Sequence, residues 1–172
     1  LLAGHYALIE RAVSGPQALV SNAVSDVFRQ RASALWNSGH GFDRLVTKVV
    51  MIMFLLALPA FAMAIALAPW AFGLAFGPSW VAAGEMAQVL LVGEAAAFIF
   101  LSINGTSIVV RAESYVFMWH AAMCLARVIT LAVVLIFSPP LVSVLVTLAA
   151  TLVFFHTFDG LMSWRMSRRI PA

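Results

Sequence analysis

Of the 172 residues, 63% are hydrophobic and only 10% are charged, whereas a soluble domain typically carries about a quarter charged residues. So little polar surface cannot coat a water-soluble fold, which excludes an ordinary soluble protein and indicates a lipid bilayer as the solvent. The net charge of +3 does not indicate nucleic-acid binding, because the basic residues lie between apolar segments, as they do beside membrane spans.

Charged residues divide the chain into apolar segments long enough to cross the hydrocarbon core, which takes about 20 helical residues. Val49 to Gly84, for example, contains no charged side chain. We expect an all-α integral membrane protein with about five transmembrane helices, at residues 1–25, 47–72, 84–108, 114–137 and 141–162. The longest connection, 26–46, is expected to hold an amphipathic surface helix and a break at Asn37 to Gly39. Because residue 1 lies inside an apolar segment, we expect a fragment of a longer protein.

Small and polar residues share one face of the first predicted helix at 100° per residue. They are Gly4, Ala7, Arg11, Ser14, Gly15, Ala18, Asn22 and Ser25. Arg11 is expensive to place in hydrocarbon and must face protein or water. Two interpretations stay open: this face lines a water-filled cavity through Arg11, Ser14 and Asn22, or Glu10 or another buried acid neutralises Arg11 structurally.

Further charged residues fall inside the third and fourth predicted helices. Glu94 has only uncharged neighbours from Met86 to Val110, so we expect it either to pair with Arg11 or Arg127 or to exchange a coupling proton or cation. In the fourth helix Glu113, His120 and Arg127 recur every seven residues and form one stripe. Arg127 lies midway along its span, where its planar guanidinium suits an anion such as phosphate. His120 is either a packed histidine or a proton-linked group.

The fifth predicted helix contains Asp159 and His156. Since Asp159 lies close to Arg165 near the end of the segment, we expect a local structural pair there.

The distribution of Lys and Arg predicts the orientation in the membrane. The first, third and fifth connections carry Arg29, Arg31, Arg44, Lys48, Arg111, Arg165, Arg168 and Arg169, whereas the connections near 73–83 and 138–140 carry none. Cytoplasmic loops are enriched in basic residues. We therefore expect the N-terminal end of the chain outside and the C-terminus in the cytoplasm.

The sequence shows no metal-ligand spacing, phosphate-binding glycine loop or nucleophile motif. No connection is long enough to form an extramembrane catalytic domain. We expect neither an enzyme nor a resident metal or cofactor.

Two stretches resemble a known family. Tyr6-Ala7-Leu8-Ile9-Glu10-Arg11, with Pro16 and the segment Val27-Phe28-Arg29-Gln30-Arg31-Ala32-Ser33, resembles the helix that opens the C-terminal half of Wzx-type polysaccharide flippases. Residues 76–90, which begin Phe76-Gly77-Pro78-Ser79-Trp80 and continue through Ala83-Gly84, resemble the FG-x-x-W-x-x-AG motif of that family. These flippases belong to the superfamily of multidrug, oligosaccharidyl-lipid and polysaccharide exporters.

The resemblance implies that residues 1–172 are the C-terminal part of a transporter with 12–14 helices in two bundles, similar to multidrug exporters of the superfamily. The whole protein would flip undecaprenyl-pyrophosphate-linked oligosaccharide across the bacterial inner membrane by alternating access, for surface polysaccharide synthesis. Its partners would be the bilayer, the lipid-linked oligosaccharide, and the polymerase and chain-length machinery. We expect Arg11 and Arg127 to contact the pyrophosphate, Ser14 and Asn22 to line the cavity, and Glu94 and His120 to couple an ion.

Two alternatives remain open. A multidrug–cation antiporter of the same superfamily would favour acidic residues in its cavity, whereas two arginines against one clear buried glutamate favour an anionic substrate. The membrane portion of an envelope glycan enzyme would need a large outward loop or a clustered polar site in the rest of the protein.

Overall fold

The computed structural model describes residues 2–169, and the side chains of all of these except 2–10, 12, 13, 131, 135 and 141. Within this range the chain forms helices and no strand, which confirms the predicted all-α fold. The helical segments are α1 (Leu2–Asn37), α2 (Asp43–Phe76), the 3-10 turn η1 (Pro78–Trp80), α3 (Val81–Leu101), α4 (Thr106–Val109), α5 (Glu113–Phe137) and α6 (Leu141–Ser167).

Four of the described segments are long and apolar enough to cross a membrane: Asp43–Phe76, Pro78–Val109, Glu113–Val134 and Val142–Ser167. The protein is therefore a multi-pass membrane protein. α1 is long enough to span the bilayer, but it is not among these four. Its charged and polar residues lower its hydropathy.

α1 is one continuous helix, although the sequence predicted a span at 1–25 followed by a separate surface helix. Residues 26–37 contain neither proline nor glycine, so nothing in the backbone interrupts the helix there. Its buried side continues through Phe28 and Ala32, which keeps this part packed on the bundle. The chain turns only after Asn37, where Gly39 has a φ of 79°.

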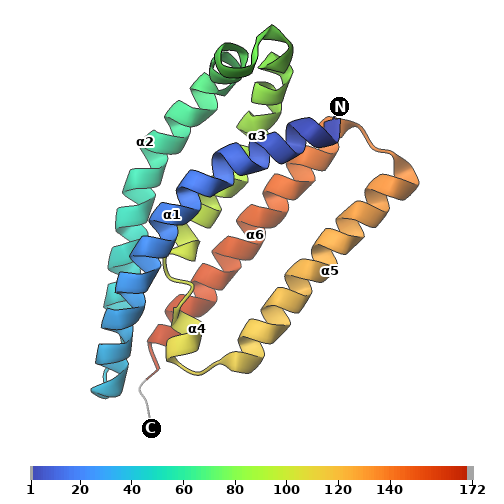
Figure 1. Ribbon diagram of the computed structural model, residues 1–172. Coiled ribbons are helices and arrows are strands. Elements are labelled where there is room, and N and C mark those ends of the chain that lie inside the picture. Colours follow the sequence, from blue (N-terminus) through green and yellow to red (C-terminus); the bar gives the residue numbers. More distant parts are fainter. Residues whose placement is uncertain (1, 170–172) are drawn as a thin grey trace.

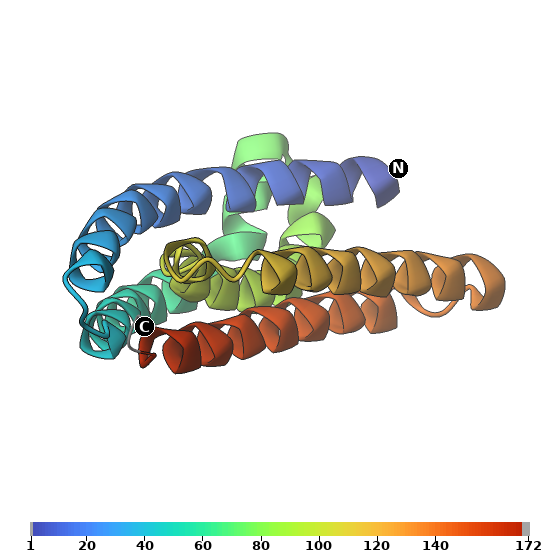
Figure 2. The ribbon, with the colours of Figure 1, turned by 90° about the horizontal axis from the view of Figure 1, so that it is seen from below.

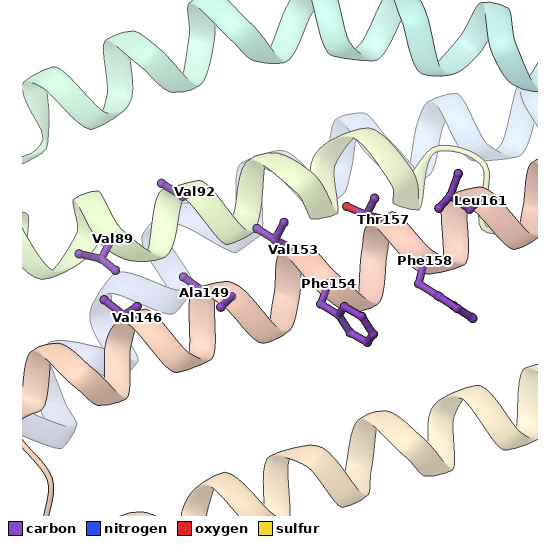
Figure 3. A pocket seen from close by; sticks show the side chains of 10 residues that line it. Val89, Val92, Val146, Ala149, Val153, Phe154, Thr157, Phe158 and Leu161 are labelled. Carbon is purple, nitrogen blue, oxygen red and sulfur yellow. The ribbon is translucent and has the colours of Figure 1, made fainter.

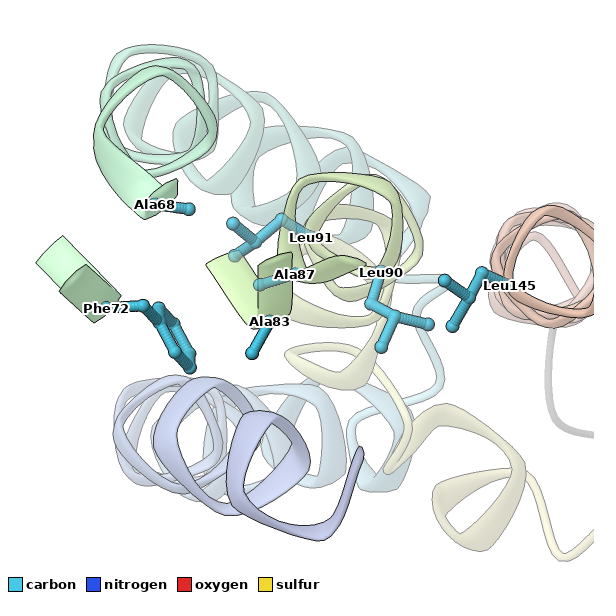
Figure 4. Packing of buried hydrophobic residues seen from close by; sticks show 7 residues of the cluster. All are labelled: Ala68, Phe72, Ala83, Ala87, Leu90, Leu91 and Leu145. Carbon is cyan, nitrogen blue, oxygen red and sulfur yellow. The ribbon is translucent and has the colours of Figure 1, made fainter. Parts of the chain in front are cut away.

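α3 is the central helix, with α1, α2 and α6 packed around it, while α5 stands at the edge beside α6 (Figures 1 and 2). Small residues bring α2 and α3 close together. Ala68 and Phe72 of α2 meet Ala83, Ala87 and Leu91 of α3, as Figure 4 shows. On the other side of α3, Leu90 faces Leu145 of α6. Small side chains favour close helix packing in membranes, where the hydrophobic effect does not hold helices together.

The motif residues at 76–84 form the corner between α2 and α3. Gly77 has a φ of 100°, a conformation that suits glycine, and Pro78 then begins η1. The rings of Phe76 and Trp80 lie 5.6 Å apart across the corner. A Cβ at Gly84 would lie 2.5 Å from the Cα of Pro69, so only glycine permits this approach of α3 to α2. This segment therefore shapes the bundle.

The connection between α1 and α2 is tied to the end of α6. The backbone N–H of Phe42 donates to the carbonyl of Ser167 at 2.9 Å. A Cβ at Gly41 would lie 3.1 Å from the same carbonyl oxygen. This contact joins the start of α2 to the end of α6.

Candidate functional site

A polar contact joins α1 to the middle of α3. The Ser14 hydroxyl donates to Oε1 of Glu94 at 3.1 Å, and the Gln17 amide donates to Oε2 of the same carboxylate. One turn further along, the Ser21 hydroxyl donates to the carbonyl of Phe98 at 3.1 Å. Polar groups buried between membrane helices normally find such partners. The structure thus brings together Ser14 and Glu94, which the sequence suggested for different roles.

The face of α1 that packs on α3 differs from the predicted one. Gln17 and Ser21 are buried, whereas Arg11, Gly15 and Asn22 are exposed. The small, polar face therefore flanks the contact with α3. Gly4, Ala7 and Glu10, which belong to the same expectations, lie outside the described side chains.

A polar cleft lies where α3 ends and α4 begins. It has a volume of about 380 Å³ and is lined by Asn22, Ser25, Asp26, Arg29, Leu101, Asn104, Gly105 and Ile108. The guanidinium of Arg29 donates to Asp26 at 2.5 Å. A Cβ at Gly105 would overlap the aliphatic stem of Arg29, so glycine makes room for this side chain.

The sequence interpretation treated 84–108 as one span and did not anticipate this cleft. Within the single apolar span Pro78–Val109, α3 gives way after Leu101 to tighter turns, whose N–H groups at Ile103, Asn104 and Thr106 donate to carbonyls three residues back, and α4 begins at Thr106. The Ser102 hydroxyl donates to the carbonyl of Ile99 at 2.6 Å, and the Thr106 hydroxyl donates to that of Ile103 at 2.8 Å. Such local bonds compete with helix continuation. The polar run Asn104-Gly105-Thr106-Ser107 lies inside an apolar segment. This run was the feature of the sequence that could have indicated the turn and the cleft.

Two of the predicted site residues are on α5 and do not belong to the contact between α1 and α3. His120 and Arg127 are exposed, and Nδ1 of His120 lies 2.8 Å from the carbonyl oxygen of Val116. α5 packs on α6 and α4, whereas Ser14 and Glu94 belong to the contact between α1 and α3.

Asp159 is paired differently from the prediction. It is buried and accepts a hydrogen bond of 2.7 Å from the Tyr115 hydroxyl of α5, whereas the sequence suggested a local pair with Arg165. Trp119, one turn after Tyr115, packs with ring centroids 5.0 Å from Phe155 and 5.3 Å from Phe158. The aspartate therefore links two helices, and Tyr115 was missed because pairing across helices leaves no local spacing signal.

No protein-family profile, curated protein or solved structure matches this chain.

A second hollow is apolar and lies between α3 and α6. It has a volume of about 640 Å³, and Val89, Val92, Val153, Phe154 and Leu161 are among its lining residues (Figure 3). An adjoining hollow of about 590 Å³ extends it toward α2. Hydrocarbon walls suit acyl or isoprenoid chains and not a polar glycan. Among the described residues, no group of three or more His, Cys, Asp or Glu side chains is placed to hold a metal ion.

Proposed function

We propose that the chain is part of a transporter that flips a lipid-linked oligosaccharide across a membrane by alternating access. The observation that carries this proposal is the polar cleft with Arg29 at the break between α3 and α4. The turns between α3 and α4 interrupt the helix beside this cleft, and interrupted helices form substrate and ion sites in many transporters.

The chemistry of such a substrate fits the two kinds of hollow. A pyrophosphate and a glycan need polar and cationic contacts, which Asn22, Arg29 and Asn104 offer in the cleft once Arg29 exchanges its partner Asp26 for the phosphate. The long isoprenoid needs hydrocarbon, which the groove between α3 and α6 offers. The substrate we favour is undecaprenyl-pyrophosphate-linked oligosaccharide in a bacterial inner membrane.

The resemblance of residues 76–90 to the flippase family supports this proposal through the fold. Gly77, Trp80 and Gly84 shape the corner between α2 and α3, so the resemblance concerns the arrangement of helices and not substrate contacts. It is equally compatible with other exporters of the same superfamily.

A multidrug–cation antiporter of that superfamily remains the second candidate. The sequence disfavoured it because two arginines, Arg11 and Arg127, were expected to be buried, whereas only one acidic residue, Glu94, was clearly expected to be buried. In the structure both arginines are exposed, whereas Asp159 is buried and Glu94 is half-buried. The balance of buried charge therefore no longer separates the two candidates, and substrate measurements must do so.

The deciding experiment is leaflet translocation by the full-length protein in vesicles that contain a fluorescent polyprenyl-pyrophosphate oligosaccharide. We expect flipping by the wild type and a loss of at least tenfold in Arg29→Gln. Gly105→Ala should act similarly, because its Cβ displaces the Arg29 stem. The matched control is Arg168→Gln, which removes an arginine stacked on Trp164 at 4.7 Å and outside the cleft.

The same assay tests the two predicted arginines separately. Full activity of Arg11→Ala and Arg127→Ala would remove them from the substrate path and leave the cleft as the anion site. If the wild type does not flip the oligosaccharide but exports cationic dyes, the antiporter replaces the flippase.

A further inference from the structure

α1 and α2 enclose a narrow groove near the turn that joins them. Both helices pack mainly on α3 rather than on each other, which leaves this space between them. The groove has a volume of about 310 Å³. Val24, Val27 and Phe28 line it from α1, and Leu45 and Val49 line it from α2. Its walls are therefore almost entirely hydrocarbon.

The buried side of the groove is firmly packed. Phe28 is 1% exposed, and its ring lies 6.2 Å from that of Phe42 in a cluster of buried residues that includes Val46 and Ile103. On the outer side, Val27 is 51% exposed. A well-packed apolar wall that stays open on its outer side suits a hydrocarbon chain.

Arg31 supplies a charge at this groove, because its side chain is part of the lining. The side chain is exposed. Among the described residues no carboxylate pairs with it, whereas Arg29, two positions earlier, pairs with Asp26. The planar guanidinium of an arginine matches the oxygens of a phosphate. The groove thus combines apolar walls with a cation that is available to an anionic ligand.

Two more basic residues lie at the same end of α2. Arg44 and Lys48 are exposed and directly precede the lining residues Leu45 and Val49 in the sequence. They therefore flank the lining residues on the helix surface. From Val49 to Phe76, α2 carries no charged side chain. The groove has a basic rim and continues into the part of the bundle whose surface is hydrocarbon.

The size and chemistry of the groove limit what can occupy it. One turn of an α-helix with its side chains, about 5.4 Å long and about 10 Å across, fills roughly 400 Å³, which is more than the groove holds. A free phosphate ion leaves the apolar walls without a partner, and a neutral lipid leaves Arg31 without one. A lipid with a hydrocarbon chain and an anionic phosphate satisfies both.

We propose that the groove between α1 and α2 binds an anionic phospholipid of the surrounding bilayer, with an acyl chain against Phe28 and Val49 and the phosphate on Arg31. Basic pockets between membrane helices recognise anionic headgroups in this way. The bound lipid joins two helices that otherwise meet mainly through α3. This proposal requires only that the chain spans a membrane, and it is independent of what the protein transports.

The test is photo-crosslinking of the purified full-length protein in nanodiscs of phosphatidylcholine with a minor fraction of phosphatidylglycerol that carries a diazirine in one acyl chain. Mass spectrometry of the digested protein locates the label, which we expect within residues 23–28 and 45–49. In Arg31→Gln this label is expected to fall about fivefold, the effect of one basic residue at a lipid surface. The matched control is Arg165→Gln, which removes an exposed arginine of α6 outside the groove.

A second pair of variants tests the apolar walls while Arg31 stays in place. Ala23→Phe fills the groove from an exposed lining position and is expected to prevent the labelling. Ala122→Phe adds the same ring at an exposed position of α5 and should leave the labelling unchanged. Because Arg31, Ala23 and both control residues are exposed, none of these substitutions disturbs a buried contact.

Four results would overturn the proposal. Equal labelling by phosphatidylcholine with the same diazirine chain, or unchanged labelling in Arg31→Gln, would remove the anionic headgroup. A wild type without label in both segments would show that another part of the full-length protein covers the groove. Displacement of the label by polyprenyl-pyrophosphate oligosaccharide would assign the groove to the transported substrate. Failure of the flipping assay bears on none of these results, so the two proposals fail separately.

Discussion

Gly84 is the residue at which α2 and α3 come closest. A Cβ there would lie 2.5 Å from the Cα of Pro69 and 2.6 Å from the carbonyl oxygen of Ala68. Both are backbone atoms, so a methyl group must push the helices apart. Gly84→Ala is therefore expected to lower the free energy of unfolding by about 1–3 kcal/mol. Denaturant unfolding in mixed micelles measures this difference.

Gly15→Ala is the matched control, since no atom lies within 4 Å of a Cβ at that exposed helical position. Alanine there is expected to leave stability unchanged or to raise it by up to about 1 kcal/mol, because alanine is the better helix former. Equal effects of the two substitutions would show that α2 and α3 do not touch at Gly84.

The polar face that the sequence predicted on α1 and the face of α1 that packs on α3 overlap at Ser14, which bonds to Glu94. Small and polar residues of α1 were grouped around Arg11, Ser14 and Asn22, yet Gln17 and Ser21 are the ones buried. Choosing the packed face of a helix from the polarity of its own residues assumes that the neighbouring helix is apolar. α3 instead presents the Glu94 carboxylate and the Phe98 carbonyl, which accept hydrogen bonds from polar residues of α1. The identity of the neighbour was not readable from α1 itself.

Among the elements, α5 is the least integrated. None of its described side chains is buried, and its contact with α6 is made by Trp119 with two phenylalanines and by the bond from Tyr115 to Asp159. A helix held along one side can move relative to its neighbours. The sequence predicted its bounds well, because charge and proline flank it, but gave no sign of this loose packing.

The bond between Tyr115 and Asp159 can be measured with a double-mutant cycle. Tyr115→Phe removes the donor hydroxyl, and Asp159→Asn removes the charge but keeps the shape. Hydrogen bonds between membrane helices average about 0.6 kcal/mol and reach about 1.7 kcal/mol. We expect the coupling free energy from the four unfolding curves to lie near the upper figure, because the acceptor is a buried carboxylate. A coupling of zero would mean that the aromatic contacts alone hold α5.

For the whole molecule, the helix ends that carry basic residues lie together. The ends of α1, α4 and α6 and the starts of α2 and α5 lie toward the lower end of the bundle in Figure 1, while the corner at η1 lies at the opposite end. Arg11 and Arg127 are the exceptions within the helices. Charge-free stretches of sufficient length made this architecture predictable from the sequence, since few other folds tolerate them.

Cysteine labelling tests the predicted orientation. In a Cys124→Ser background, Ser79→Cys places an exposed thiol at the corner between α2 and α3, and Ser38→Cys places one at the turn between α1 and α2. We expect an impermeant maleimide to label Ser79→Cys in intact spheroplasts and Ser38→Cys only after permeabilisation, because basic ends stay in the cytoplasm. The reverse pattern would invert the orientation and place the Arg29 cleft on the outer side.

The tie between Phe42 and Ser167 has a consequence for biosynthesis. Ribosomes add about 5–20 residues per second, so the start of α2 is in the bilayer on the order of ten seconds before its hydrogen-bond acceptor at the end of α6 has been made. During that interval the start of α2 has no partner at this position. The contact forms only when the end of α6 has been made.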